Sequence, residues 1–152
     1  MYKKNGMSLL EIILSIAIAV IVLLITISLF SNYNEKQVLD NSIEKTFSIL
    51  KEARSLTLSS RDDSSYGVHI EQGSVILFKG TSYVSNDPNN KLNEIDKKTI
   101  ISLINLNGGG SDVVFQKLTG KTSQYGTINV SLSDLSKTKV LEIGQTGLIE
   151  KN

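Results

Sequence analysis

The N-terminal stretch reads KKNGMSLLE at positions 3–11 and continues into an apolar run at positions 12–30. The run has nineteen residues, none of them charged, and three hydroxyl side chains are its only polar groups. As an α-helix it would be about 28 Å long, which is enough to cross the hydrocarbon core of a bilayer. Glu11 stands at its head. Inserting an ionisable side chain into a membrane costs about 2.5–3.5 kcal/mol or more, so a residue of this kind in a membrane span is a candidate functional residue.

The charges on either side of the run predict its orientation. Lys3 and Lys4 precede it, whereas Glu35 and Lys36 cancel beyond it. The positive-inside rule therefore predicts a single-pass protein of the cytoplasmic (inner) membrane, with a cytoplasmic N-terminus and an exported C-terminal domain. A secretory signal peptide cleaved after Ala19 fits less well, because that site lies in the middle of the run.

Composition excludes several classes of function. The 152 residues include no cysteine and one histidine, His69. Without cysteine there is neither a disulfide nor a thiolate metal site, and one histidine cannot build the usual zinc centre or a Ser-His-Asp triad. Sixteen Lys and Arg against fifteen Asp and Glu give no general attraction to nucleic acid. We expect no metal, no cofactor and no enzymatic activity.

Behind the apolar run the pattern becomes amphipathic, without an interrupting glycine or proline. Apolar residues spaced by four, four, three and three indicate one face of an α-helix. This stripe consists of Leu39, Ile43, Phe47, Leu50 and Ala53. We expect one helix from Met7 to about Ser59, with Phe47 central to the core that the stripe covers.

Beyond residue 60 the apolar residues recur with a period of two, which is typical of strands. Strands are predicted at 66–70, 75–78, 99–106, 113–118, 127–132 and 139–143, with a short last one at 148–149. Glycine-rich turns and a proline loop at 86–90 separate them. The predicted fold class is α+β: a long N-terminal α-helix, with a transmembrane half and an amphipathic half, packed on an antiparallel β-sheet domain.

The N-terminal stretch resembles the prepilin leader of type IV pilins and of the pseudopilins of type II secretion. In that family a short basic leader ends in glycine, a prepilin peptidase cuts after it, and the new N-terminal residue is N-methylated. The fifth residue after the cut is glutamate. The resemblance implies cleavage between Gly6 and Met7, although the family prefers phenylalanine after the cut. It also implies N-methylation of Met7 and an assembly charge pair between Glu11 and the Met7 amine of an adjacent subunit.

The resemblance divides the chain into a leader peptide at 1–6, a transmembrane or filament-core helix at 7–30, its amphipathic continuation at 31–60, and a β-rich pilin head at 61–152. It implies a structural subunit of a type IV pilus (fimbrium) or a type II secretion pseudopilus, located after assembly in a cell-surface or periplasmic filament. The implied partners are other pilin subunits, the prepilin peptidase and methyltransferase, the lipid bilayer, and an inner-membrane assembly platform with its ATPase.

Later motifs are similar to those of the GspH/FimT-like minor pseudopilins. They are Ala53-Arg54, the strand at 66–70, residues 113–115 followed by Gly120, residues 126–130, and a C-terminal strand near Gly147. Major pilins usually have a helix-breaking proline about twenty residues into the mature chain, where this sequence has Ser28. The difference favours a minor subunit.

Some FimT-like proteins bind DNA through a basic Gly-Arg-x-Arg segment near the C-terminus. The matching place here, at 147–150, reads GLIE and contains no arginine. Direct DNA binding is therefore not expected beyond weak non-specific contact. The alternative functions are a competence-pilus minor pilin that captures DNA, for which a local basic patch remains at Lys117, Lys121, Lys137 and Lys139, and a membrane-anchored domain that does not polymerise.

Two further motifs are interpreted as ordinary loops. Asp62, Asp63 and Asp87 have the oxygen ligands that calcium prefers, but no twelve-residue calcium loop surrounds them. The GKT sequence at 120–122 lacks the glycine that a phosphate loop requires five positions earlier, because that position is Phe115.

Overall fold

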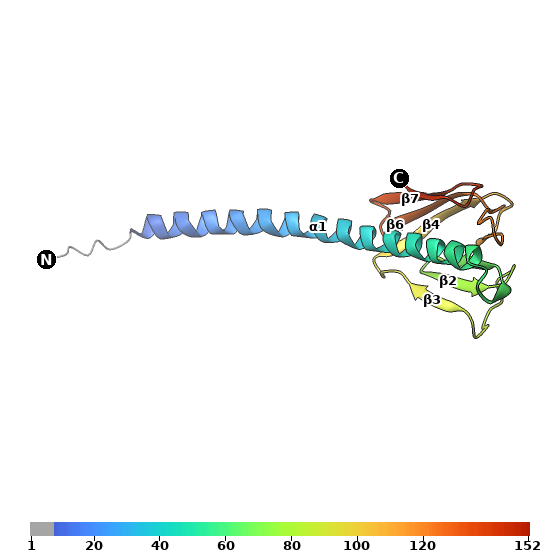
Figure 1. Ribbon diagram of the computed structural model, residues 1–152. Helices are drawn as coiled ribbons and strands as arrows, with labels where there is room; N and C mark the ends of the chain where they lie inside the picture. Colours follow the sequence, from blue (N-terminus) through green and yellow to red (C-terminus); the bar gives the residue numbers. More distant parts are fainter. Residues whose placement is uncertain (1–7) are drawn as a thin grey trace. The chain divides into compact units, whose positions relative to one another are not determined.

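The computed structural model of the chain describes residues 8–152, with side chains at all of them except 25–32. It divides into two compact units, Met1–Lys36 and Gln37–Asn152. The long helix α1 (Leu9–Leu58) belongs to both (Figure 1). The fold is α+β with antiparallel sheets, as the sequence predicted.

In the first unit α1 begins at Leu9, where the carbonyl of Ser8 accepts the N–H groups of Glu11 and Ile12. Every side chain described between residues 8 and 24 is exposed. Among the residues described, no helical stretch is long and apolar enough to cross a membrane. The span predicted at 7–30 lies partly outside those residues, since Met7 and the side chains at 25–30 are not among them.

The second unit contains, within the described residues, the rest of α1, a 3₁₀-helix η1 (Arg61–Asp63) and two four-stranded antiparallel sheets. The first sheet has the order β3-β2-β1-β5 and consists of β1 (Tyr66–Ile70), β2 (Ser74–Lys79), β3 (Lys91–Glu94) and β5 (Asp112–Val114). The second has the order β4-β6-β7-β8 and consists of β4 (Thr99–Leu106), β6 (Gly126–Leu132), β7 (Thr138–Ile143) and β8 (Ile149–Lys151).

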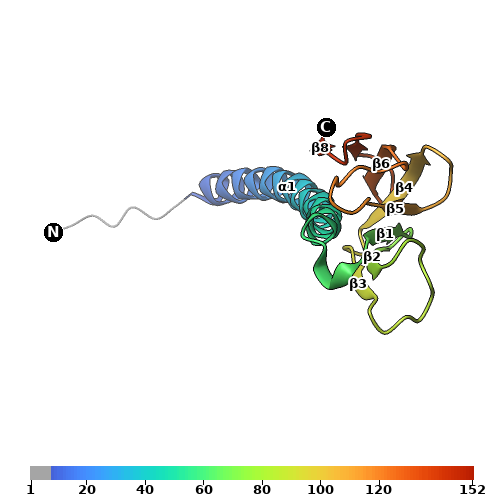
Figure 2. The ribbon, with the colours of Figure 1, turned by 45° about the vertical axis from the view of Figure 1, so that its right-hand side comes forward.

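One hydrophobic core joins the second half of α1 to both sheets. Figure 2 shows this part of the helix beside the two sheets. Side chains without any exposed surface come from all three elements: Leu50 and Ala53 from α1, Val68, Val75 and Val113 from the first sheet, and Ile128, Val130 and Leu141 from the second. Fully burying a side chain of this size contributes about 1.5–3 kcal/mol, so the shared core stabilises the whole second unit.

Two hydroxyl groups of α1 connect the helix to the two sheets. Ser42 Oγ lies 2.8 Å from Thr99 Oγ1 at the start of β4. Thr57 Oγ1 accepts the N–H of Tyr66, the first residue of β1, at 2.9 Å. Because all four residues are buried, losing either bond would leave an unsatisfied polar group at a cost of about 1–3 kcal/mol.

Phe47 is not central to the core, contrary to the sequence prediction. It is only partly buried at the edge of the core, and the ammonium groups of Lys51 and Lys151 lie 5.1 and 4.6 Å from its ring centroid. The buried face of α1 instead passes through Thr46 and Ile49. Counting only large apolar residues misplaced the centre of the face, because threonine can be buried when its hydroxyl bonds to the preceding turn, as Thr46 does to Ser42 O at 3.0 Å.

Most predicted strands are confirmed, with two differences. The strand expected at 113–118 is shorter: β5 ends at Val114, and the chain turns at Leu118, which has a left-handed φ of 64°. The strand β3 was not predicted because its sequence, KLNE, does not alternate, and Leu92 remains exposed. It pairs with β2 at the edge of the first sheet.

We predict that Leu50→Ala destabilises the second unit more than Phe47→Ala does. In a chain that begins at Ser31, Leu50→Ala should lower the free energy of unfolding by about 2–5 kcal/mol, because it leaves a cavity in a closed core. Phe47→Ala should cost roughly 1–2 kcal/mol, since part of its ring already meets water. Urea unfolding measures both. A larger loss for Phe47→Ala would contradict the observed orientation of the helix.

Candidate functional site

The residues that the sequence assigned to processing and assembly lie at the N-terminus. Gly6 and Met7 are outside the described residues. Glu11 lies in the first turn of α1 with an exposed side chain. Its carbonyl accepts the hydroxyl of Ser15 at 2.7 Å, while its carboxylate has no ion pair with any other described residue.

The first unit presents an exposed apolar surface. The large side chains from Leu9 to Leu24 are between 45% and 76% exposed, because the helix packs on nothing else in that unit among the described residues. An exposed apolar patch larger than a few hundred Å² marks a protein or membrane interaction site. This stretch of α1 is thus a candidate interaction surface, and Glu11 is the one charge among its described residues.

Three residues that carried the GspH/FimT resemblance meet at the end of α1 in the second unit. Arg54 Nε donates to the carbonyl of Gly120 at 3.4 Å, and its Nη2 donates to the carbonyl of Thr146 at 3.5 Å. Gly120 and Gly147 both have left-handed φ values, 62° and 73°. A Cβ added to Gly147 would lie 1.8 Å from the Gly120 carbonyl oxygen. These residues join two loops to the helix, so their role in this structure is architectural.

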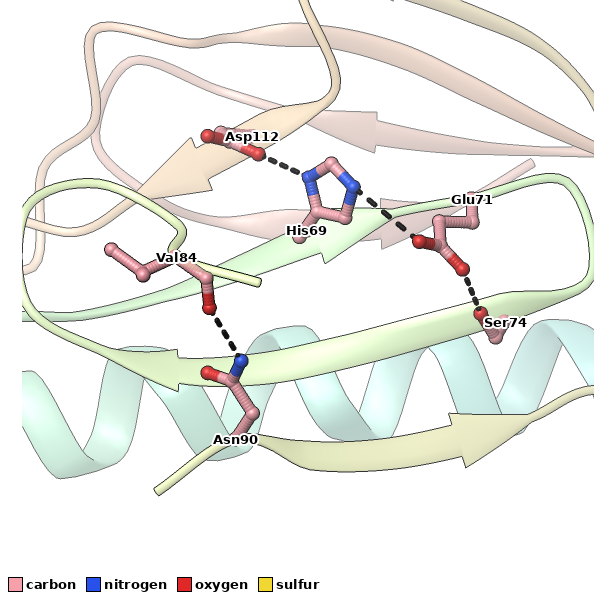
Figure 3. Close-up of polar contacts among 6 residues, drawn as sticks. All are labelled: His69, Glu71, Ser74, Val84, Asn90 and Asp112. Atoms are coloured by element: carbon pink, nitrogen blue, oxygen red, sulfur yellow. Dashed lines mark hydrogen bonds and ion pairs between the residues drawn. The ribbon is translucent and has the colours of Figure 1, made fainter. Parts of the chain in front are cut away.

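His69 belongs to a polar cluster on the outer side of β1 (Figure 3). Its Nδ1 lies 2.5 Å from Asp112 Oδ1 on β5, and its Nε2 lies 3.8 Å from Glu71 Oε1. The Tyr83 ring stacks on the imidazole with centroids 4.0 Å apart and 4° between the planes. Ser74 Oγ donates to the second oxygen of Glu71 at 2.7 Å. The sequence indicated only a lone strand histidine, because Tyr83 and Asp112 are far from it along the chain.

The loop after β2 covers the outer side of the first sheet and supports this cluster. Phe78 packs against Tyr83 with ring centroids 5.8 Å apart. Gly67 makes room for Phe78, since a Cβ there would lie 2.5 Å from the phenyl ring. Asn90 closes the loop by donating to the carbonyl of Val84 at 2.8 Å. The imidazole therefore rests on a packed aromatic layer.

The loop acids considered for calcium are engaged within the chain. The Tyr66 hydroxyl donates to Asp62 at 3.1 Å, and with the nearby charge of Lys79 this bond lowers the pKa of Asp62. A hydrogen bond and the charge of Lys117 lower the pKa of Asp63. Asp87 accepts the backbone N–H of Asn89, which lowers its pKa in the same way. The described residues contain no group of three or more His, Cys, Asp or Glu side chains that could hold a metal ion.

Lysines of the alternative DNA-binding patch, among them Lys117 and Lys139, form ion pairs within the second unit. Lys117 pairs with Asp63. Lys139 Nζ forms an ion pair with Asp40 Oδ1 on α1, at 2.5 Å. On the same face of the helix, Glu44 pairs with Lys151. These lysines pair with acidic side chains of the second unit itself. The pairing reduces the positive charge that they offer to a phosphate backbone.

The glycine-containing loops are turns, as predicted. Gly120 donates its N–H to Gln116 O at 2.9 Å and closes the turn that follows β5. Gly108, Gly109 and Gly110 all have left-handed φ values and connect β4 to β5. Neither loop leads from a strand into a helix, as a phosphate-binding loop would.

Comparison with known proteins gives no relative: no protein-family model, no curated protein and no solved structure matches the chain.

We predict that Gly147→Ala destabilises the second unit more than Gly109→Ala does. The two glycines have nearly equal φ values, 73° and 72°, so alanine suffers the same backbone strain at both, about 1–2 kcal/mol. Only at Gly147 does the added Cβ meet another group, whereas nothing lies within 4 Å of it at Gly109. The clash should add about 1–3 kcal/mol. Equal losses in urea unfolding would show that the Gly120–Gly147 contact does not exist.

Proposed function

We propose that this protein is a non-enzymatic structural subunit of a type IV pilus or a type II secretion pseudopilus, of the GspH/FimT-like minor kind. A prepilin peptidase cuts it after Gly6, its new N-terminus is methylated, and it leaves the membrane to enter a helical filament. The observation that carries the proposal is the exposed apolar half of α1, headed by Glu11, directly behind the sequence KKNG.

The apolar half of α1 needs partners that the described residues of the first unit do not provide. Its side chains between Leu9 and Leu24 are exposed in the first unit, and the sequence continues the run to Phe30 without a charge. Before assembly, lipid would surround these side chains. In a filament the helices of neighbouring subunits would replace the lipid, where van der Waals packing decides association.

The second unit supports the proposal because its hydrophobic core does not include the apolar half of α1. It has its own core and two sheets around the last half of α1. An exported head of this kind can remain folded while the apolar half exchanges lipid for protein. The architecture of one long helix with antiparallel sheets is also the one that the family resemblance implies.

Glu11 is proposed to fix the position of a subunit in the filament. Its carboxylate would meet the positively charged amine of Met7 on an adjacent subunit. Two opposite charges about 4 Å apart attract by ~4 kcal/mol at an effective dielectric constant near 20. This gain is comparable to the cost of placing the acid in the membrane, so pairing would favour the assembled arrangement.

We expect the native protein to begin at N-methylated Met7. Mass spectrometry of the protein from its own host should give the mass of residues 7–152 plus one methyl group. A small residue before the cut allows the peptidase to approach the backbone, so Gly6→Val should leave the leader attached. An intact Met1 in the wild-type protein, or a chain that starts after Ala19, would contradict the proposed processing and would favour a membrane-anchored domain that never polymerises.

We also expect Glu11→Ala and Glu11→Gln to lower filament incorporation strongly while cleavage after Gly6 continues. Glutamine keeps the shape of the side chain and loses the charge, so it separates packing from electrostatics. The ratio of subunit in sheared filaments to subunit in the membrane measures incorporation. Ser15→Ala is a matched control, because it changes a polar side chain on the same helix without changing charge. Normal assembly of both Glu11 variants would show that the charge pair is not required.

A further inference from the structure

The turn at 116–120 carries an exposed leucine at its tip. The N–H of Gly120 donates to the carbonyl of Gln116 at 2.9 Å and closes the turn. Leu118 between them is 78% exposed and has a left-handed φ of 64°, which is an outlier for a bulky residue. Residues held in such conformations cluster at functional sites. Arg54 Nε donates to the carbonyl of Gly120, so the turn lies beside the last turns of α1.

A pocket of about 570 Å³ lies in the second unit between the turn that joins β1 to β2, the end of β3 and the start of β4. Leu92 and Ile100 contribute apolar surface to its lining, and its charged lining residues are Glu71, Glu94, Asp96 and Lys97. Three acids against one lysine make the pocket acidic. It therefore suits an apolar side chain that has a basic residue close to it.

The turn and the pocket lie at different positions along α1. Arg54 contacts the turn. At the pocket, Lys45 Nζ donates to the carbonyl of Glu94 at 2.6 Å, and Ser42 Oγ bonds to Thr99. Since a helix rises 1.5 Å per residue, the nine residues from Lys45 and the twelve from Ser42 to Arg54 span roughly 14–18 Å. A contact between two such distinct surfaces joins copies head to tail, in a ring or in an open helical filament.

We propose that Leu118 of one copy enters this pocket on a second copy of the chain. Burying the leucine against Leu92 removes two exposed apolar surfaces from water. Lys121 follows Leu118 by three positions, and Glu94 lies on the same face of β3 as Leu92, two positions away. Neither Lys121 nor Glu94 forms a side-chain ion pair with another described residue. In the contact, Lys121 of one copy pairs with Glu94 of the other.

This contact is weak between free molecules, because it buries one leucine and adds one ion pair near the surface. In the proposed filament, the apolar helices would hold the second units of neighbouring subunits close together. A high effective concentration makes a weak contact count. The inference rests on the proposed function for this role, but the contact itself can be measured without a filament.

The test uses the full chain in detergent micelles at high protein concentration. Because the sequence has no cysteine, one introduced cysteine per chain reports one position. A Thr119→Cys chain, with its cysteine beside Leu118, is mixed with a Gln72→Cys chain, whose cysteine lines the pocket. After mild oxidation, a non-reducing gel measures the disulfide-linked dimer. We expect more dimer from the mixture than from either variant alone.

Ser136→Cys is the matched control for the cysteine in the turn at 116–120. Ser136 follows Leu135, which is 61% exposed and has a left-handed φ of 60°, so the two turns are alike. The turn of Leu135 lies at the same end of the second unit as the pocket, because the N–H of Ser133 donates to the carbonyl of Lys98 at 2.8 Å. A head-to-tail contact does not bring it to the pocket of another copy, and little dimer should form.

Two further changes separate a specific contact from random collision. In the Thr119→Cys chain, Leu118→Ser should lower the dimer yield about tenfold, because the pocket of the other copy loses its apolar occupant. Lys121→Glu in the same chain should lower the yield several-fold. Glu94→Lys in the Gln72→Cys chain should then restore it, since the reversed pair attracts again. A variant that merely fails to fold would not be rescued in this way.

Three results would overturn the contact. The first is a dimer yield from Thr119→Cys no higher than that from Ser136→Cys. The second is an unchanged yield with Leu118→Ser, and the third is a charge reversal that causes no loss or is not rescued by Glu94→Lys. None of them bears on cleavage after Gly6, so the proposed function would stand. Conversely, a specific dimer from a chain that its host never cleaves would leave the contact as self-association of second units.

Discussion

The burial of one helix face between two sheets is the constraint on which the second unit depends. Each sheet has an apolar face that must be covered, and the last half of α1 covers both. Small and hydroxylated residues allow this: Ala53 and Thr46 have no exposed surface, so the sheets can approach the helix closely. Ser42 and Thr57 then hydrogen-bond to the first residues of β4 and β1. Since buried polar groups must be paired, these bonds also determine where the strands begin along the helix.

The position of β1 on the helix leads directly to the His69 cluster. Thr57 holds the start of β1, and the register of β1 with β5 places His69 opposite Asp112. On the other side, β1 pairs with β2, which brings Phe78 opposite Gly67. The aromatic layer that supports the imidazole exists because the strand opposite Phe78 has a glycine there. The geometry of the surface cluster is thus a consequence of core packing and not of local sequence.

The sequence predicted the elements that show a regular apolar period, and it missed the features that depend on contacts between residues far apart in the chain. The helix and most strands follow from apolar spacing, and the α+β class follows from them. The edge strand β3 was missed because its sequence does not alternate between apolar and polar residues. Its one apolar side chain, Leu92, is exposed and does not belong to a buried face. Phe47 was misplaced because a large apolar residue looks central, although Thr46 beside it is the buried one. The pairing of His69 with Asp112 across 43 positions depends on strand register, which no local pattern contains.

The two units place different demands on their surroundings, and this contrast explains why one carboxylate could matter so much in the proposed filament. The second unit buries most of its apolar residues in its own core, whereas the first exposes those that are described at 9–24. A uniformly apolar helix gains nearly the same packing energy at many axial positions, because one aliphatic side chain contacts a neighbour much as the next does. A single ion pair in low dielectric varies steeply with distance. In the proposed filament, apolar contact would therefore supply the affinity between subunits, while the position of Glu11 would supply the register that apolar contact cannot.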